Sequence, residues 1–128
     1  MPRLLVVEDD AMIRDVLVRT LSMHGYEVVT ASDGMAGVRR ARLERPDLII
    51  MDMGLPGLNG WQATHRIRSM PATRTIPVIA LTAFVLKEDR ERCLRSGCDD
   101  YEAKPVNFAR LQAKIEALLT ARPVVNRA

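Results

Sequence analysis

Short apolar runs alternate with helical patterns along the whole chain. Compact runs of mostly aliphatic residues, each bounded by turn residues, occupy positions 4–7, 28–29, 48–51 and 78–81, and a weaker run surrounds Tyr101. Such runs predict short buried strands. Their near-continuous apolar character is typical of strands that are covered on both faces, as in a parallel sheet.

The segments between these runs carry helical spacing and helix ends. Apolar residues at i, i+3, i+4 and i+8 predict that one face of the first helix is buried, and a second stripe marks the last helix: Ile13, Val16, Leu17 and Leu21, then Phe108, Leu111, Ile115, Leu118 and Leu119. Asp10, Asp33 and Asn107 are expected to be N-caps. Gly25 and Gly97 are expected to end helices, the second of them a helix over about residues 86–96.

Five strands that alternate with five helices predict an α/β fold. Right-handed crossovers between successive strands give a parallel sheet with helices on both faces. We therefore expect a doubly wound domain. The length of 128 residues fits one such domain and leaves little room for a second.

Composition narrows the class of protein. Apolar residues make up 48% and charged residues 27%, as in ordinary globular proteins. No apolar run reaches the roughly 20 residues that cross a bilayer, so we expect a cytoplasmic protein with no membrane association.

Cys93 and Cys98 lack CxxC spacing and are expected to be free thiols. The net charge of +3 comes from scattered arginines with acidic neighbours, and we expect no nucleic-acid partner.

Chemistry-bearing side chains follow the predicted strands where each one ends. Glu8, Asp9 and Asp10 follow the first, Asp52 ends the third, and Thr82 and Lys104 end the fourth and fifth. The carboxyl ends of parallel strands meet at one edge of a sheet, where ligands bind. Singly, most of these residues have a structural explanation, such as helix capping by Asp10. Asp52 is harder to explain, because a carboxylate at the end of a buried strand is costly without compensation.

Taken together, these side chains suit phosphoryl chemistry. Oxygen ligands without histidine or cysteine favour a hard divalent ion, with Mg²⁺ the best match, while His24 and His65 fall in helical patterns away from this edge. Lys104 and Thr82 would complement the charge and oxygens of a phosphoryl group. Asp52 would be the nucleophile that forms an acyl phosphate.

The segments "VVEDD", "MDMGLPGLNG", "LTA" and "YEAKP", in this order and spacing, resemble the receiver domain of two-component response regulators over residues 3–121. The stretch "TAFVLKEDRERCLRSGCDDYEAKPV" is most similar to stand-alone receivers of the cell-cycle or cell-fate type and to receivers of hybrid histidine kinases. The resemblance implies a flavodoxin-like (βα)5 fold with strand order 2-1-3-4-5. It also implies that residues 1–122 form a receiver domain and residues 123–128 a short tail without an effector domain.

The resemblance also implies a role for each site residue. Asp52 would accept the phosphoryl group, with Thr82 and Lys104 contacting it. Mg²⁺ would be bound directly by Asp9, by Asp52 and by the backbone carbonyl of Gly54. Glu8 would bind it through a water molecule. Thr82 and Tyr101 would form a coupled switch, and a cis bond would join Lys104 to Pro105. Two positions depart from the family pattern: Gly54 lacks a side chain that can shape attack by water, and Phe84 is bulky.

The partners implied are proteins. A histidine kinase or histidine phosphotransfer protein would dock near Met12 and Ile13 and on the loop after Lys104. Output to a downstream protein would pass through the face around Lys87, Tyr101 and Phe108. We expect a monomer or weak dimer, and not an enzyme, since it would catalyse only its own phosphorylation and dephosphorylation.

Several alternatives stay open at this point. The chain could be a receiver excised from a hybrid histidine kinase. A phosphatase or phosphotransferase with Asp52 as nucleophile would need a second carboxylate as acid or base, yet Gly54 stands two residues after Asp52 and no insertion can form a cap. A flavodoxin-like nucleotide or flavin binder would need a glycine-rich phosphate loop after the first strand, where acidic residues stand instead.

Overall fold

The computed structural model describes residues 1–83 and 87–121. The strands are β1 (Arg3–Val7), β2 (Glu27–Ala31), β3 (Leu48–Asp52), β4 (Val78–Thr82) and β5 (Asp100–Ala103). The helices are α1 (Ala11–Met23), α2 (Gly34–Glu44), α3 (Gly60–Ser69), α4 (Lys87–Arg95) and α5 (Phe108–Thr120).

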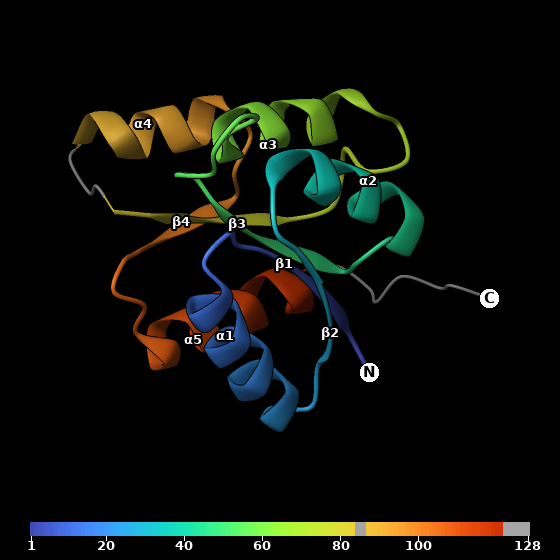
Figure 1. The fold of residues 1–128 in the computed structure, drawn as a ribbon, viewed down its shortest axis with the longest axis vertical. Coiled ribbons are helices and arrows are strands. Elements are labelled where there is room, and N and C mark those ends of the chain that lie inside the picture. The colour runs from blue at the N-terminus through green and yellow to red at the C-terminus, as the bar shows by residue number, and fades with distance from the viewer. Residues whose placement is uncertain (84–86, 122–128) are drawn as a thin grey trace.

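The five strands form one parallel sheet in the order β2-β1-β3-β4-β5. Helices α2, α3 and α4 cover one face of the sheet, and α1 and α5 cover the other (Figure 1). The predicted doubly wound α/β fold and its strand order are confirmed.

Alternate residues of the central strands pack into two separate hydrophobic cores, one on each face of the sheet. Leu5, Val7, Ile49 and Met51 pack toward the α2–α4 layer, and Leu4, Val6, Leu48 and Ile50 pack toward α1 and α5. Side chains alternate between the faces of a strand, so a sheet with helices on both faces needs apolar residues at every position. That requirement explains the unbroken apolar runs in the sequence.

The predicted helix ends are confirmed. The side chains of Asp10, Asp33 and Asn107 accept backbone N–H groups at the starts of α1, α2 and α5. Gly25 and Gly97 follow α1 and α4 with positive φ angles of 88° and 100°. Such angles are open to glycine without the steric cost that other residues meet.

One prediction about the core is wrong. In α1, Leu17 and Leu21 are buried as expected, but Ile13 and Val16 are 37% and 46% exposed. Within the described residues, helix α1 packs on β1 and β2 and shares a core with α5, and its apolar stripe is wider than the surface it covers. In α5, Leu111 and Ile115 are buried, and Phe108, Leu118 and Leu119 pack partly buried against the same core.

Across the described residues, no helix combines the length and the apolar character that crossing a membrane requires. The two cysteines are buried thiols. The predicted tail at residues 123–128 lies outside the described residues, so the domain boundary at residue 122 stays a prediction.

Candidate functional site

The carboxyl ends of β1, β3, β4 and β5 meet at one cleft. In the register of the sheet, Val7 lies beside Met51, Asp52 beside Leu81, and Thr82 beside Ala103. The residues that end or directly follow these strands therefore gather at one edge. The cleft has a volume of about 460 Å³, and its lining includes every predicted site residue except Tyr101: Glu8, Asp9, Asp52, Gly54, Thr82 and Lys104.

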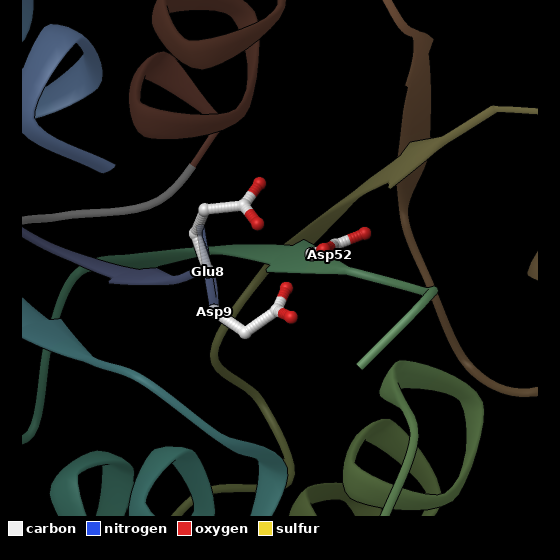
Figure 2. Close-up of side chains that lie close together, drawn as sticks. All are labelled: Glu8, Asp9 and Asp52. Atoms are coloured by element: carbon white, nitrogen blue, oxygen red, sulfur yellow. The ribbon is translucent and has the colours of Figure 1, made fainter. Parts of the chain in front are cut away.

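Three carboxylates form an acidic cluster at the floor of this cleft. Glu8 and Asp9 follow β1 and Asp52 ends β3, and Figure 2 shows the three side chains close together. One oxygen from each lies within 4.8 Å of the others. Glu8 and Asp52 are buried, whereas Asp9 is exposed at the mouth. Neither His24 nor His65 lines the cleft, in agreement with the sequence prediction.

Lys104 compensates part of this negative charge. Its Nζ lies 3.0 Å from Asp52 Oδ1 and 3.4 Å from Glu8 Oε1. Burial alone would lower the pKa of Lys104, but its contacts with Asp52 and Glu8 outweigh burial and raise the pKa. Lys104 is therefore a cation at neutral pH, held directly beside the predicted phosphoacceptor. The bond from Lys104 to Pro105 is cis, as predicted.

The two buried carboxyls differ in their proton affinity. Burial raises the pKa of Glu8 to about 7, and the neighbouring Asp52 adds to that rise. Burial acts in the same direction on Asp52, but the Gly54 N–H, which donates to Asp52 Oδ1 over 3.0 Å, and Lys104 outweigh it. The pKa of Asp52 is thus lowered, and Asp52 is the carboxylate that stays ionised.

The turn after β3 explains why the chain bends away directly after Asp52. Asn59 and Gln62 form a capping box that starts α3, and Gly60 lies against the end of β3. A Cβ atom at Gly60 would stand 2.2 Å from the backbone oxygen of Asp52. Only glycine allows this close approach, which brings the start of α3 against the end of β3 beside the cleft.

The cluster fits a hard divalent cation. Glu8 Oε1 is buried and accepts no hydrogen bond, and Lys104 Nζ, 3.4 Å away, compensates its charge only in part, so a second cation would be favourable here. The available donors are oxygens, the ligands that Mg²⁺ prefers. Asp9, Asp52 and Glu8 are in place to hold the ion. Gly54 also lines the cleft, and the role of its carbonyl stays a prediction.

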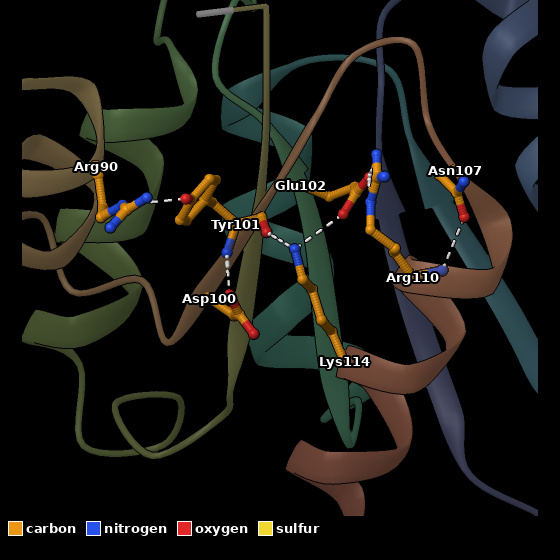
Figure 3. A network of polar contacts seen from close by, with 7 residues as sticks. All are labelled: Arg90, Asp100, Tyr101, Glu102, Asn107, Arg110 and Lys114. Carbon is orange, nitrogen blue, oxygen red and sulfur yellow. Dashed lines mark hydrogen bonds and ion pairs between the residues drawn. The ribbon is translucent and has the colours of Figure 1, made fainter. Parts of the chain in front are cut away.

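Tyr101 lies outside this cleft, on β5, between α4 and α5 (Figure 3). The Nε atom of Arg90 donates to its hydroxyl over 3.0 Å, and the Arg90 and Lys114 cations lie 5.6 Å and 5.2 Å from its ring centroid. Thr82 is buried at the end of β4. The predicted coupling of Thr82 to Tyr101 stays a prediction.

Sequence reasoning missed the charged residues beside Tyr101. Glu102 is buried in β5 and pairs with Lys114 over 2.8 Å and Arg110 over 3.1 Å. Burial would raise the pKa of Glu102, but Lys114 and Arg110 together lower it. The one available signal was composition, because Lys114 is one of only three lysines. The second departure from the family pattern, Phe84, lies outside the described residues.

A model of the response regulator receiver domain matches residues 4–116. The chain belongs to this family. Among relatives, it is 44% identical over 119 residues to the transcriptional regulatory protein AfsQ1 of Streptomyces coelicolor. The matched segment covers 93% of this chain and 52% of AfsQ1. It is 41% identical over 117 residues to the phosphate regulon regulatory protein PhoB of Escherichia coli, covering 91% of the chain and 51% of PhoB. This receiver thus spans about half the length of these relatives.

Solved receiver structures share the fold. The receiver domain of a sensor histidine kinase from Pseudomonas aeruginosa superposes with a TM-score of 0.86 at 41% identity, covering 93% of this chain and 98% of that one. That structure has magnesium coordinated in its active-site cleft. The receiver of a histidine kinase from Syntrophus aciditrophicus gives a TM-score of 0.89 at 32% identity, covering 100% and 97% of the two chains. The predicted receiver family is confirmed, while the narrower resemblance to cell-cycle or hybrid-kinase receivers stays a prediction.

Proposed function

We propose that this receiver is a phosphoaspartate-operated switch that takes a phosphoryl group from a histidine kinase or a histidine phosphotransfer protein on Asp52. The observation that carries the proposal is the set of contacts around Asp52. A buried carboxylate with a lowered pKa lies 3.0 Å from Lys104 and shares an acidic cluster with Glu8 and Asp9.

The chain's own residues can carry the transfer. An oxygen of ionised Asp52 attacks phosphorus, and the phosphorus–nitrogen bond of a donor phosphohistidine that is protonated on its other ring nitrogen breaks. The electron pair of that bond returns to the ring, so neutral imidazole leaves. Lys104 offsets charge on the phosphoryl oxygens, and the Thr82 hydroxyl donates to one of them after phosphorylation. Mg²⁺, held by Asp9, Asp52 and the Gly54 carbonyl, and by Glu8 through water, would supply further positive charge to the same oxygens.

An apolar groove beside the cleft suits the protein donor. Ile13 and Lys104 line both the cleft and the groove, which has a volume of about 300 Å³ and is otherwise apolar: Met12, Val16, Leu17, Pro105, Val106 and Phe108. Exposed apolar side chains next to a polar reaction site favour a docking surface for an amphipathic helix that carries the phosphohistidine. This role explains why Ile13 and Val16 stay exposed among the residues that the structure describes.

Phosphorylation would then be transmitted to the face around Lys87 and Tyr101, where a downstream protein binds. Phe108, which the sequence also placed on that face, lines the groove beside α1 instead. The relatives AfsQ1 and PhoB are named as regulators of transcription, and the RpaA protein of Synechocystis, 40% identical over 93% of this chain, is named as DNA-binding. The chain matches only 49% of RpaA. The expectations that this receiver binds no nucleic acid, is cytoplasmic and is a monomer or weak dimer therefore stay predictions.

The alternative of an Asp52-dependent phosphatase has less support. It would need a second carboxylate that acts as acid or base near the nucleophile. Position 54, two residues after Asp52, is a glycine and offers no carboxylate. Glu8 is paired with Lys104, and the Oδ1 of Asp10 accepts the Met12 and Ile13 N–H groups at the start of α1. The two solved structures compared above are receivers of histidine kinases, so an origin in a hybrid kinase stays an alternative.

The test is phosphate-affinity gel mobility after incubation with acetyl phosphate or phosphoramidate, run with Mg²⁺, with a chelator and with Asp52→Asn. We expect a shifted band that requires both Mg²⁺ and Asp52. If wild type shifts equally in chelator, or if Asp52→Asn shifts as wild type does, the proposal is wrong. If no shift occurs while Mg²⁺ still binds, a phosphorylated histidine phosphotransfer protein replaces the small donors, and a lack of transfer from it would also contradict the proposal.

A further inference from the structure

The side of the cleft away from α1 is formed by a tryptophan and an arginine that the proposed function does not use. Trp61 lies in the first turn of α3 and Arg92 lies on α4, and the two helices cover the same face of the sheet (Figure 1). The guanidinium carbon of Arg92 lies 4.7 Å from the Trp61 ring centroid. Both residues line the cleft that holds Asp52.

Arg92 has no acidic partner in the part of the chain that the structure describes, and its guanidinium instead lies over the Trp61 ring. Arg68 and Arg110 form ion pairs with Asp99 and Glu102. Among the residues that the structure describes, none of the ion pairs or side-chain hydrogen bonds includes the Arg92 guanidinium, although four carboxylates line the same cleft. Stacking on an indole fixes the plane of a guanidinium and leaves its N–H groups available for a planar or tetrahedral anion.

The cleft has room for a small donor molecule beside Asp52. A volume of about 460 Å³ falls within the range of sites that bind small molecules. Of the cleft-lining residues, Lys104 and Arg92 are the cations, and Lys104 already contacts Asp52 and Glu8. An anion that enters the cleft from solvent would therefore find its available guanidinium donor on Arg92.

We propose that Arg92, held against Trp61, binds the phosphate of a small acyl phosphate donor as it enters the cleft and so speeds the phosphorylation of Asp52 by that donor. The inference rests on the proposed phosphorylation of Asp52. An Asp52 oxygen attacks phosphorus, the bond from phosphorus to the acyl oxygen breaks, and the carboxylate leaves with the electron pair. No proton, oxidant or reductant is needed. Arg92 contacts the donor dianion as it enters, before Lys104 and Thr82 contact the transferred group.

The test compares Arg92→Ala with Arg95→Ala. Arg95 is an exposed arginine on the same helix that does not line the cleft, so the two variants change the net charge equally. Rates of Asp52 phosphorylation by acetyl phosphate are measured on phosphate-affinity gels, with melting temperatures as the check on folding. We expect Arg92→Ala to react about three- to fivefold more slowly than wild type, the size of one partly exposed charge contact. Arg95→Ala should react at the wild-type rate.

Two further measurements separate a donor contact from a structural effect. The rate ratio of wild type to Arg92→Ala should fall as KCl is added, because salt screens the attraction between a guanidinium and a dianion. Arg92→Lys should recover part of the rate, since it keeps the charge and loses the planar donors. A folded Arg92→Ala that reacts as fast as wild type overturns this inference alone. If acetyl phosphate does not phosphorylate the wild-type protein, this inference is also wrong. The proposed function is then tested separately, by phosphotransfer from a protein donor.

Discussion

Lys104 Nζ lies 3.0 Å from Asp52 Oδ1, so the cation of β5 already occupies one side of the predicted phosphoacceptor. The same Nζ lies 3.4 Å from Glu8 Oε1. A phosphoryl group and a divalent ion would both have to share this acidic cluster with Lys104. The lysine therefore has two opposed effects, because it attracts the phosphoryl group and repels the metal.

Lys104→Met should separate these two effects. Loss of the cation leaves the carboxylates uncompensated, so we expect Mg²⁺ to bind at least about threefold more tightly in alkaline buffer, where Glu8 is ionised. Phosphorylation by acetyl phosphate should nevertheless be slower. Mg²⁺ affinity can be measured by quenching of Trp61, the single tryptophan, which lines the cleft. Lys87→Met, an exposed lysine of α4, is the matched control, and weaker Mg²⁺ binding by Lys104→Met would contradict the prediction.

Gly54→Asn should change the lifetime of the acyl phosphate without changing the fold. A Cβ atom at Gly54 would have its nearest contact with Asp52 Oδ1 at 3.7 Å, an ordinary van der Waals distance. The new amide would therefore lie beside the bond that water attacks. We expect a melting temperature like that of wild type and an altered dephosphorylation rate, measured as decay of the phosphorylated band. Gly54→Ala is the control without a polar group, and identical decay for wild type and Gly54→Asn would refute this idea.

Gly60→Ala, in contrast, should disturb the site through the backbone. The added methyl group would meet the Asp52 carbonyl oxygen at 2.2 Å and the Met53 Cα at 2.7 Å, so the end of β3 or the start of α3 must move. We expect a loss of about 1–3 kcal/mol of stability in urea unfolding, as for other overpacked positions. Mg²⁺ binding should weaken as well. A variant as stable as wild type would show that this approach is not constrained.

Much of this site was predictable because parallel sheets obey a simple spatial rule. Glu8, Asp52, Thr82 and Lys104 end or follow different strands, and the shared direction of the strands brings them together whatever the details of packing. The apolar runs that predict the strands are also strong, since every residue of β3 and β4 is buried. Local spacing was enough to predict both the sheet and the edge of the sheet at which these polar side chains gather.

The features that were missed depend on contacts between separate elements. Ile13 and Val16 keep the spacing of a buried helix face, and spacing alone does not tell a core from a docking surface. Trp61 and Arg92 lie on different helices, so their stacking has no local pattern. Glu102 is a charged residue inside a short strand, and its burial becomes understandable only once α5 brings Lys114 and Arg110 to it.

Glu102→Gln should make stability less dependent on pH. Lys114 and Arg110 lower the pKa of buried Glu102, so the unfolded chain binds the proton more tightly. The stabilisation is therefore fully present above the ordinary glutamate pKa and is lost as pH falls through the lower pKa of the folded protein. At neutral pH we expect Glu102→Gln to be less stable by about 1–3 kcal/mol. Urea unfolding from neutral to acid pH should show this gap closing, and a gap that stays constant would contradict the prediction.

Arg90→Ala should release the Tyr101 side chain. In the present conformation Arg90 Nε donates to the Tyr101 hydroxyl over 3.0 Å, and this contact favours the ring position between α4 and α5. Without it, the equilibrium should shift toward the position that Tyr101 adopts after phosphorylation of Asp52. The chain has two tyrosines, so fluorotyrosine labelling gives two ¹⁹F signals, and Tyr26, which accepts from Gln112, is the internal reference. We expect the Tyr101 signal of unphosphorylated Arg90→Ala to move part of the way toward its phosphorylated position in wild type, while Tyr26 stays unchanged. A Tyr101 signal that phosphorylation leaves in place would show that this tyrosine is not part of the switch.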